Sequence, residues 1–163
     1  MIIEINVEKD VIEKAKMKAE EMGELNNSIT SGEGNIAGFI GEEIVKNYIN
    51  AKEANTYDYD LIKEDFKIDV KTKRTGVVPL PHYEASVANY NPNQKCDVYV
   101  FVRVLNDFTK AYICGWLSKK DYFKRAKFLK KGQVDPSNNW KVKADCYNVP
   151  YKNMNQIKKC NQF

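Results

Sequence analysis

The spacing of the hydrophobic residues changes part-way along the chain. In two early segments, residues 5–23 and 35–52, apolar side chains recur every three to four positions, which is the period of an amphipathic helix. Gly23 would end the first helix. Gly38 and Gly41 lie inside the second helix, where glycine weakens an isolated helix, and we expect them to let this helix lie close against a sheet.

From residue 56 onward the hydrophobic period becomes two, which is the period of a β-strand. The predicted strands are residues 56–62, 66–74, 96–105, 110–117 and 140–149. The third of these is almost entirely apolar, so we expect it at the centre of a sheet. Ser118 is a good N-cap for a short helix over 118–129. The stretch 77–94 is expected to be irregular with one short element, and a last helical turn should follow residue 150.

This order of elements predicts one α/β (α+β) domain, in which a central mixed sheet is flanked by helices. The 163 residues are 43% hydrophobic, and no apolar run reaches the roughly 18 residues that a membrane-spanning helix needs. The first residues contain no charged leader followed by a long apolar region, so we expect a cytoplasmic protein. The four cysteines are scattered, which predicts partly buried thiols and not a zinc site or a disulfide framework.

Charge is distributed unevenly along the chain. Residues 1–65 hold 15 acidic and 7 basic residues, a net charge of −8. Residues 66–163 hold 7 acidic and 19 basic residues, a net charge of +12. Such a basic segment favours a polyanionic partner, although solvated surface lysines would give the same counts.

The strand over residues 66–74 carries two charged side chains on one face. Asp69 and Lys71 lie two positions apart and therefore point the same way. If this strand forms a tight hairpin with the strand before it, turning at residues 64–65, Asp60 stands directly opposite Asp69. The expected pairs are Lys63 with Phe66, Ile62 with Lys67, Leu61 with Ile68 and Asp60 with Asp69.

Two carboxylates placed so close together repel each other and destabilise a sheet unless a cation lies between them. We therefore expect Asp60 and Asp69 to bind Mg²⁺, for which Mn²⁺ would substitute, because hard divalent cations prefer carboxylate oxygens. Lys71 would orient the attacking water and stabilise developing negative charge. Lys73 and Arg74 suit contacts with phosphate.

The pattern Asp60-x8-Asp69-Val70-Lys71 resembles the core motif of the PD-(D/E)XK nuclease superfamily, which includes restriction endonucleases, Holliday-junction resolvases and recombination exonucleases. In that superfamily an acid on one strand and a (D/E)-x-K motif on the next bind Mg²⁺ and cut phosphodiester bonds. Two positions depart from the usual pattern: Tyr59 stands where proline is common, and the acid of the second motif is aspartate in place of glutamate.

The resemblance also implies a glutamate on the preceding helix. Gly41 and Glu42, followed by Val45 and Tyr48, are similar to the helix pattern of the superfamily. Glu42 is the first choice for the helix acid, and Glu43 is the alternative. The metal ligands implied in this way are Asp60, Asp69 and Glu42, with the backbone carbonyl of Val70 assisting.

The function implied by the resemblance is that of a Mg²⁺-dependent nuclease with a restriction-endonuclease-like core, which hydrolyses phosphodiester bonds of DNA. Its metal-site core would span about residues 35–75, followed by a basic part over 76–163. A role in recombination, repair or degradation of phage or mobile-element DNA, in a host cytoplasm, is implied as well, and many members act as homodimers.

Because the superfamily includes inactive members, two alternatives stand beside this function. They are a catalytically inactive nucleic-acid-binding module and a protein-interaction subunit with the same fold. The residues expected to contact DNA are Lys73, Arg74, His82, Tyr83 and Gln94.

Overall fold

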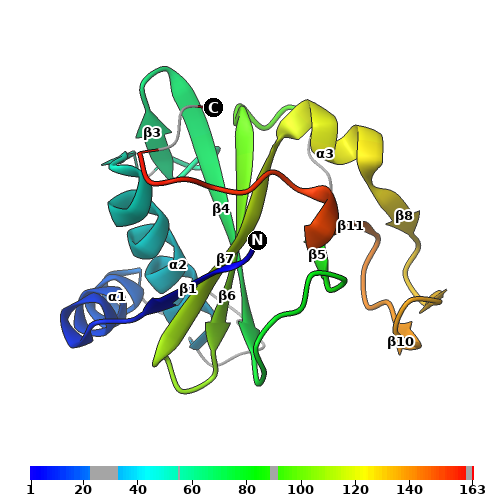
Figure 1. Ribbon diagram of the computed structural model, residues 1–163, viewed down its shortest axis with the longest axis horizontal. Helices are drawn as coiled ribbons and strands as arrows, with labels where there is room; N and C mark the ends of the chain where they lie inside the picture. The colour runs from blue at the N-terminus through cyan, green and yellow to red at the C-terminus, as the bar shows by residue number, and fades with distance from the viewer. Residues whose placement is uncertain (23–32, 55, 89–91, 161–162) are drawn as a thin grey trace.

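A six-stranded mixed sheet runs through the middle of the computed structural model (Figure 1). Its strand order is β1-β7-β6-β4-β3-β2, with β4 and β6 parallel and the other neighbours antiparallel. The strands are β1 (Ile3–Asn6), β2 (Lys52–Glu53), β3 (Leu61–Lys63), β4 (Phe66–Thr75), β6 (Val98–Leu105) and β7 (Lys110–Ser118). The structure describes residues 1–22, 33–54, 56–88, 92–160 and 163.

Different layers cover the two faces of this sheet (Figure 1). Helices α1 (Lys9–Glu21) and α2 (Glu33–Ile49) lie on one side. The short helix α3 (Lys119–Arg125) and a three-stranded sheet of β5 (Glu84–Ala88), β11 (Cys146–Pro150) and β8 (Lys127–Leu129) lie on the other. A small hairpin of β9 (Val134–Asp135) and β10 (Trp140–Lys141) and the 3₁₀ turn η1 (Tyr151–Asn153) complete the second side. The molecule is therefore one mixed α/β domain.

The alternation of side chains along β6 separates two hydrophobic cores. Four of its valines lie in the aliphatic core beneath α1 and α2. Between them, Tyr99 and Phe101 point to the opposite side, where they join a second, aromatic core with Tyr122 and Tyr151. The rings of Phe101 and Tyr122 stack with their centroids 5.2 Å apart. All of β6 except its last residue is buried, which confirms the prediction of a central strand.

One of the two glycines of α2 allows this helix to lie against β4. A Cβ atom at Gly41 would come within 2.0 Å of the hydroxyl oxygen of Thr72, so only glycine permits the observed approach. At Gly38 a Cβ atom would meet nothing within 4 Å. The expectation of close packing is therefore confirmed for Gly41 and wrong for Gly38.

The predicted N-terminal helix begins later than expected. Residues 3–6 form β1, which pairs with the edge of β7, and the helix starts only at Lys9. Ile3 and Ile5 are partly buried against the core and alternate with exposed residues, which is the pattern of an edge strand. The prediction of a helix from residue 5 was wrong for this reason. Gly23, the expected end of the helix, lies outside the described residues.

Three other boundaries differ from the sequence prediction. The strand expected over 56–62 is formed only by Leu61–Lys63, because a turn at Thr56 and Tyr59 precedes it. The helix expected over 118–129 ends at Arg125, and β8 follows. The strand expected over 140–149 is divided into β10 and β11. These strands are two to five residues long and too short to give a clear period.

Two local predictions, the register of the β3–β4 hairpin and the cap of α3, are confirmed. The β3–β4 hairpin has the expected register over its three ladder pairs, from Lys63 with Phe66 to Leu61 with Ile68. Ser118 caps α3 by accepting a hydrogen bond of 3.0 Å from the backbone N–H of Asp121. The described cysteines form no disulfide; Cys96, Cys114 and Cys146 are buried and Cys160 is exposed. In the described ranges, no helix is long and apolar enough to cross a membrane.

Candidate metal centre

Asp60 is held against β4 by two backbone hydrogen bonds. Its own N–H donates to the carbonyl of Ile68 at 2.9 Å, and its carboxylate Oδ2 accepts from the N–H of Val70 at 2.7 Å. The predicted cross-strand pairing of Asp60 with Asp69 was wrong, because Asp60 lies just before β3 and outside the ladder. Its carboxylate nevertheless contacts the residue that stands between Asp69 and Lys71.

Asp69 and Lys71 share the face of β4 that turns away from α2. The Lys71 ammonium lies 2.6 Å from Oδ2 of Asp69 and 5.9 Å from the ring centroid of Tyr99. Asp69 is only 7% exposed, and apart from this ion pair its Oδ2 has no hydrogen-bond partner among the described residues. A carboxylate oxygen in this position has capacity for a further cation.

The pKa of Asp60 is raised by its surroundings. Burial is the main cause, and the negative charge of Asp69 adds to it, so that the pKa of Asp60 reaches about 6. The hydrogen bond from Val70 and the charge of Lys71 act in the opposite direction. Lys71 and the N–H of Val70 therefore do not fully offset the effects of burial and of Asp69 on the pKa of Asp60.

Glu42 on α2 belongs to the same electrostatic environment. Burial, followed by the negative charge of Asp60, raises the pKa of Glu42 to about 8. Glu53 and Asp69 contribute in the same direction, and Lys18 opposes them. Three acids on β4, on α2 and before β3 thus influence one another, and burial deprives them of water.

The neighbouring Glu43 has a different environment. Its carboxylate contacts the ammonium groups of Lys14 at 3.1 Å and Lys46 at 2.5 Å. Burial raises its pKa, but these two lysines more than offset that effect and hold the pKa of Glu43 below its usual range. The contacts therefore favour Glu42 over Glu43 as the helix acid.

The donor chemistry of these acids fits a hard divalent cation. Carboxylate oxygens are the ligands that Mg²⁺ prefers, and the raised pKa values of Asp60 and Glu42 indicate a local shortage of positive charge. Within the described part of the chain, no three histidine, cysteine or acidic side chains form a ready-made metal cage. The carboxylates of Asp60, Asp69 and Glu42 therefore do not converge on one point, although they influence one another electrostatically.

The expected phosphate-binding residues do not all lie together. Lys73 continues the face of Asp69 and Lys71 and lines a large cavity beyond them. Arg74 lies on the opposite face of β4, where its guanidinium stands 5.7 Å from the ring centroid of Phe108. Lys73 and Arg74 therefore lie on opposite faces of β4, because adjacent strand residues point to opposite sides, and their contact with phosphate stays a prediction.

His82 and Tyr83 lie in the loop before β5, and both line the same cavity as Lys73. Their rings are perpendicular, with centroids 5.0 Å apart. The side chain of Gln94 links the turn before β3 to strand β6. It donates to the carbonyl of Asp58 at 2.9 Å and accepts from the hydroxyl of Tyr99 at 3.0 Å.

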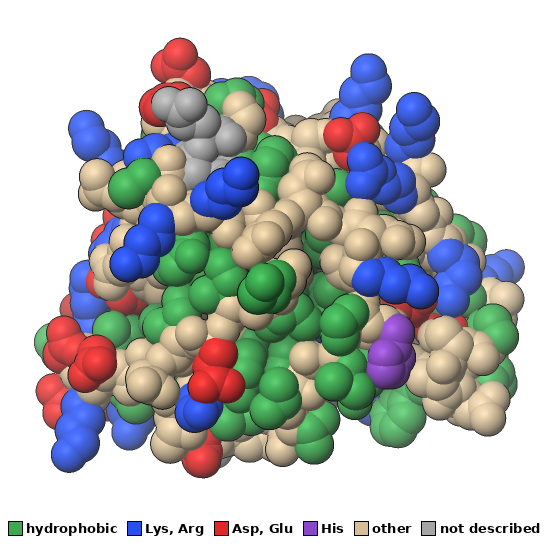
Figure 2. Space-filling model, in the orientation of Figure 1, with side chains coloured by type: hydrophobic (Ala, Val, Ile, Leu, Met, Phe, Trp, Pro, Cys, Tyr) green, Lys and Arg blue, Asp and Glu red, His purple; other side chains and the backbone are tan. Residues whose placement is uncertain are grey.

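The space-filling view shows Lys and Arg side chains around the rim of one face and hydrophobic side chains across its middle (Figure 2). On this face the Lys and Arg side chains are thus scattered and do not form a single stripe.

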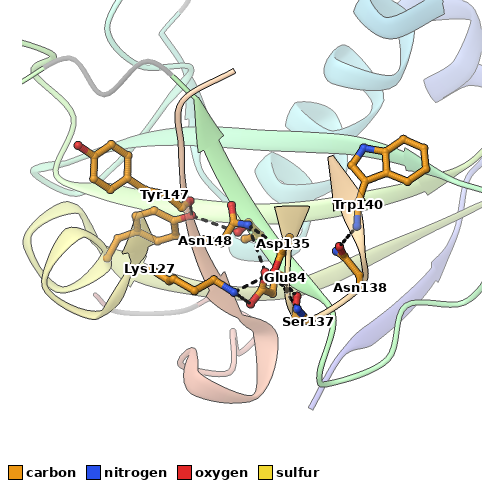
Figure 3. Close-up of polar contacts among 10 residues, drawn as sticks. Glu84, Lys127, Asp135, Ser137, Asn138, Trp140, Tyr147 and Asn148 are labelled. Atoms are coloured by element: carbon orange, nitrogen blue, oxygen red, sulfur yellow. Dashed lines mark hydrogen bonds and ion pairs between the residues drawn. The ribbon is translucent and has the colours of Figure 1, made fainter. Parts of the chain in front are cut away.

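A second cluster of acidic side chains was not found from the sequence (Figure 3). Lys127 lies 3.4 Å from a carboxylate oxygen of Glu84 and 3.1 Å from one of Asp135. The side-chain amide of Asn148 donates to both acids, at 3.2 and 3.4 Å. These residues come from β5, β8, β9 and β11, and no local pattern in the sequence links them.

Hydrogen bonds and ion pairs satisfy the two carboxylates of this second cluster. Ser137 donates to Asp135 through its backbone N–H at 2.9 Å and through its hydroxyl at 2.8 Å. Burial opposes ionisation of Asp135, but the bonds from Ser137 and Lys127 outweigh it and lower the pKa of Asp135 to about 2. Asp135 therefore stays ionised at any pH at which the protein would normally be handled.

Comparison of the sequence with models of known protein families and with curated proteins finds no match.

Proposed function

We propose that the protein is a Mg²⁺-dependent nuclease that hydrolyses phosphodiester bonds of DNA, built on a restriction-endonuclease-like core. The observation that carries this proposal is the hydrogen bond of 2.7 Å from Val70 to Asp60. It ties the first acid of the motif to the strand segment that bears Asp69 and Lys71. A motif whose parts are far apart in space would carry no chemistry.

In this proposal Asp60 and Asp69 hold the metal ion, and the backbone carbonyl of Val70 assists. Glu42 binds a water or a second ion from the α2 side. A bound divalent cation would lower the pKa of its water and polarise a phosphoryl oxygen. Mn²⁺ would substitute for Mg²⁺, because both accept carboxylate oxygens.

Lys71 has a role of its own in the proposed reaction. Its ammonium is held by Asp69 on one side and by the ring of Tyr99 beneath it. From this position it would orient the attacking water and stabilise the negative charge that develops on the phosphate. Loss of the ion pair on phosphate binding would free both groups for these roles.

The choice of DNA rests on charge and on the resemblance of the motif. Residues 66–163 carry a net charge of +12, which favours a polyanion. By the same resemblance we propose a role in recombination, repair or degradation of phage or mobile-element DNA, and action as a homodimer on substrates with two strands.

The test is a cleavage assay on linear, circular, branched and single-stranded DNA, with Mg²⁺, with Mn²⁺ or with EDTA. We expect cleavage that requires a divalent cation and that Asp69→Asn abolishes. The matched control is Asp65→Asn, because Asp65 is an exposed acid at the turn of the same hairpin and should be dispensable. Cleavage that persists in Asp69→Asn would contradict the proposed mechanism.

The same samples separate the alternatives. DNA binding that weakens steeply with salt but never leads to cleavage would indicate a nucleic-acid-binding module. Absence of any salt-dependent DNA binding would indicate a protein-interaction subunit.

A further inference from the structure

A cavity of about 600 Å³ lies on the side of the sheet opposite α1 and α2. It is lined by residues of β4, the small hairpin β9–β10 and the strands β5 and β11, it opens to solvent, and its volume is in the range of pockets that hold a small organic molecule. The residues that matter for its chemistry are Lys73, Glu84, Arg103, Asp135, Trp140 and Asn148.

Asn148 of β11 lines the cavity and has a buried side-chain acceptor that the described residues leave without a donor. Asn148 is only 7% exposed, and its amide group is already committed to Glu84 and Asp135 (Figure 3). Its Oδ1 atom has no hydrogen-bond partner in the part of the chain that the structure describes. Because a buried acceptor without a donor costs free energy, this atom calls for an N–H or O–H group from a ligand.

The rim of the cavity carries positive charge and an aromatic ring. Lys73, Arg103 and Lys143 line it, and Arg103 lies beside Lys73 on the neighbouring strand β6. Desolvation by the surrounding walls and the charge of Arg103 lower the pKa of Lys73, although its side chain remains in contact with solvent. Repulsion between these cations favours the entry of an anionic group.

Trp140 is the exposed aromatic residue of the rim. It is 64% exposed, which is unusual for a tryptophan, and it stands apart from the acidic cluster in Figure 3. Its backbone N–H donates to the side-chain oxygen of Asn138 at 2.9 Å, which fixes the turn that presents the indole ring. An exposed ring on a fixed turn can stack on a flat aromatic ligand.

The large cavity shares lining residues with a second cavity that Lys71 lines. A smaller cavity of about 90 Å³ is lined by Lys71 at one end and shares Lys73, Glu84 and Ser86 with the larger one. Lys71 and Lys73 share one face of β4, and their Cα atoms are about 7 Å apart at the usual rise of a strand. A nucleotide next to a phosphate at Lys71 would therefore reach the large cavity.

We propose that this cavity binds a single unstacked nucleobase that carries an exocyclic amino group. The amino group donates to Oδ1 of Asn148, the ring stacks on Trp140, and the flanking phosphate contacts Lys73. The inference rests on the proposed function for the identity of the polymer. It deepens that function by assigning a substrate form, which is a strand with at least one base out of the stack.

The test measures binding in EDTA by fluorescence anisotropy, with a labelled short single strand in which every position except one is abasic. The remaining position carries adenine, purine without the amino group, or no base. We expect adenine to bind about 5- to 100-fold more tightly than the fully abasic strand. It should bind about 2- to 12-fold more tightly than the strand with purine, because purine leaves Asn148 without a donor.

Two variants connect this difference to the cavity. Trp140→Ala should remove most of the preference for adenine over the abasic strand. Phe128→Ala is the matched control, because Phe128 is also an exposed aromatic residue of the second side but does not line the cavity. Both residues are exposed, so neither change should prevent folding.

Equal binding of all three strands, or a preference that survives Trp140→Ala, would overturn the inference. The binding assay measures no cleavage. A negative result would therefore refute the base pocket without refuting the nuclease activity. Metal-dependent cleavage without base preference would remove only the pocket assignment. A base preference without cleavage would support the pocket and contradict the nuclease.

Discussion

Two groups of buried and half-buried acidic side chains lie on this small domain, and their surroundings shift the carboxyl pKa values in opposite directions. Glu84 and Asp135 receive a lysine, an asparagine amide and two hydrogen bonds from Ser137, and the pKa of Asp135 is lowered to about 2. Asp60 and Glu42 receive far less, and burial together with like charges raises their pKa values to about 6 and about 8.

Glu84 and Asp135 thus have a structural role, whereas Asp60 and Glu42 lack a sufficient counter-charge. In the cluster at Glu84, a lysine and several hydrogen-bond donors satisfy both carboxylates, and these contacts join β5, β8, β9 and β11. The cluster at Asp60, Asp69 and Glu42 costs free energy as long as it is ionised without a cation. Acids that are retained at such a cost are candidates for binding and catalysis.

The largest expected effect is on catalysis at the cluster of Asp60, Asp69 and Glu42. Lys71→Met should lower the rate of DNA cleavage by at least about 100-fold, because it removes the cation beside the reacting phosphate. Lys16→Met, which changes an exposed lysine of α1, is the control and should leave the rate unchanged. Initial rates under single-turnover conditions give the comparison, and equal rates for both variants would refute the role of Lys71.

The next effect concerns the helix that carries Glu42. Gly41→Ala should lower the free energy of unfolding by about 1–3 kcal/mol, because the new Cβ collides with Thr72 and pushes α2 away from β4. Gly38→Ala, one helical turn earlier and with free space around it, should raise it by about 0.5–1 kcal/mol through helix propensity. Urea unfolding measures both, and the same sign for both changes would argue against the close approach.

Removing one uncompensated acid should stabilise the protein. In EDTA at pH 8, Glu42→Gln is expected to raise the free energy of unfolding by about 2 kcal/mol, because it removes a buried charge beside Asp60. The neighbouring change Glu43→Gln breaks contacts with Lys14 and Lys46 and should lower it slightly. Thermal unfolding gives both values, and a loss of stability in Glu42→Gln would mean that this acid is compensated.

The smallest effect is the pH dependence of the satisfied cluster. The pKa of Asp135 is about 2 in the folded protein, against an ordinary value of 3.8. Asp135 therefore contributes stability that is fully present above pH 4 and is lost as the pH falls towards 2. The stability difference between the native protein and Asp135→Asn should shrink by about 1–2 kcal/mol over this range. A constant difference in urea unfolding from pH 4 to pH 2 would contradict the pKa shift.

Some features of the fold could be predicted from the sequence. The register of the β3–β4 hairpin follows from a two-residue turn and the alternation of apolar residues, and Ser118 at the start of α3 is a local capping signal. The edge strand β1 was missed because its four residues merge with the hydrophobic pattern of the following helix.

The contacts within the candidate sites were harder to predict from the sequence. The tie between Asp60 and β4 uses the backbone N–H of Val70, and no side-chain pattern reveals a backbone donor. Glu84, Lys127, Asp135 and Asn148 meet only because β5, β8, β9 and β11 come together, so their proximity is a property of the tertiary fold. Residue spacing in the sequence cannot predict such contacts.

The most direct test of the central claim is a titration of the ¹⁵N-labelled protein with Mn²⁺, followed by NMR. Paramagnetic Mn²⁺ broadens the amide signals of residues close to the ion. If the under-compensated acids take up a divalent cation, the signals of Asp60, Asp69 and Val70 should disappear first, while those of Ser137 and Asn148 persist. Earlier loss of the Ser137 and Asn148 signals, or uniform broadening across the protein, would contradict the account.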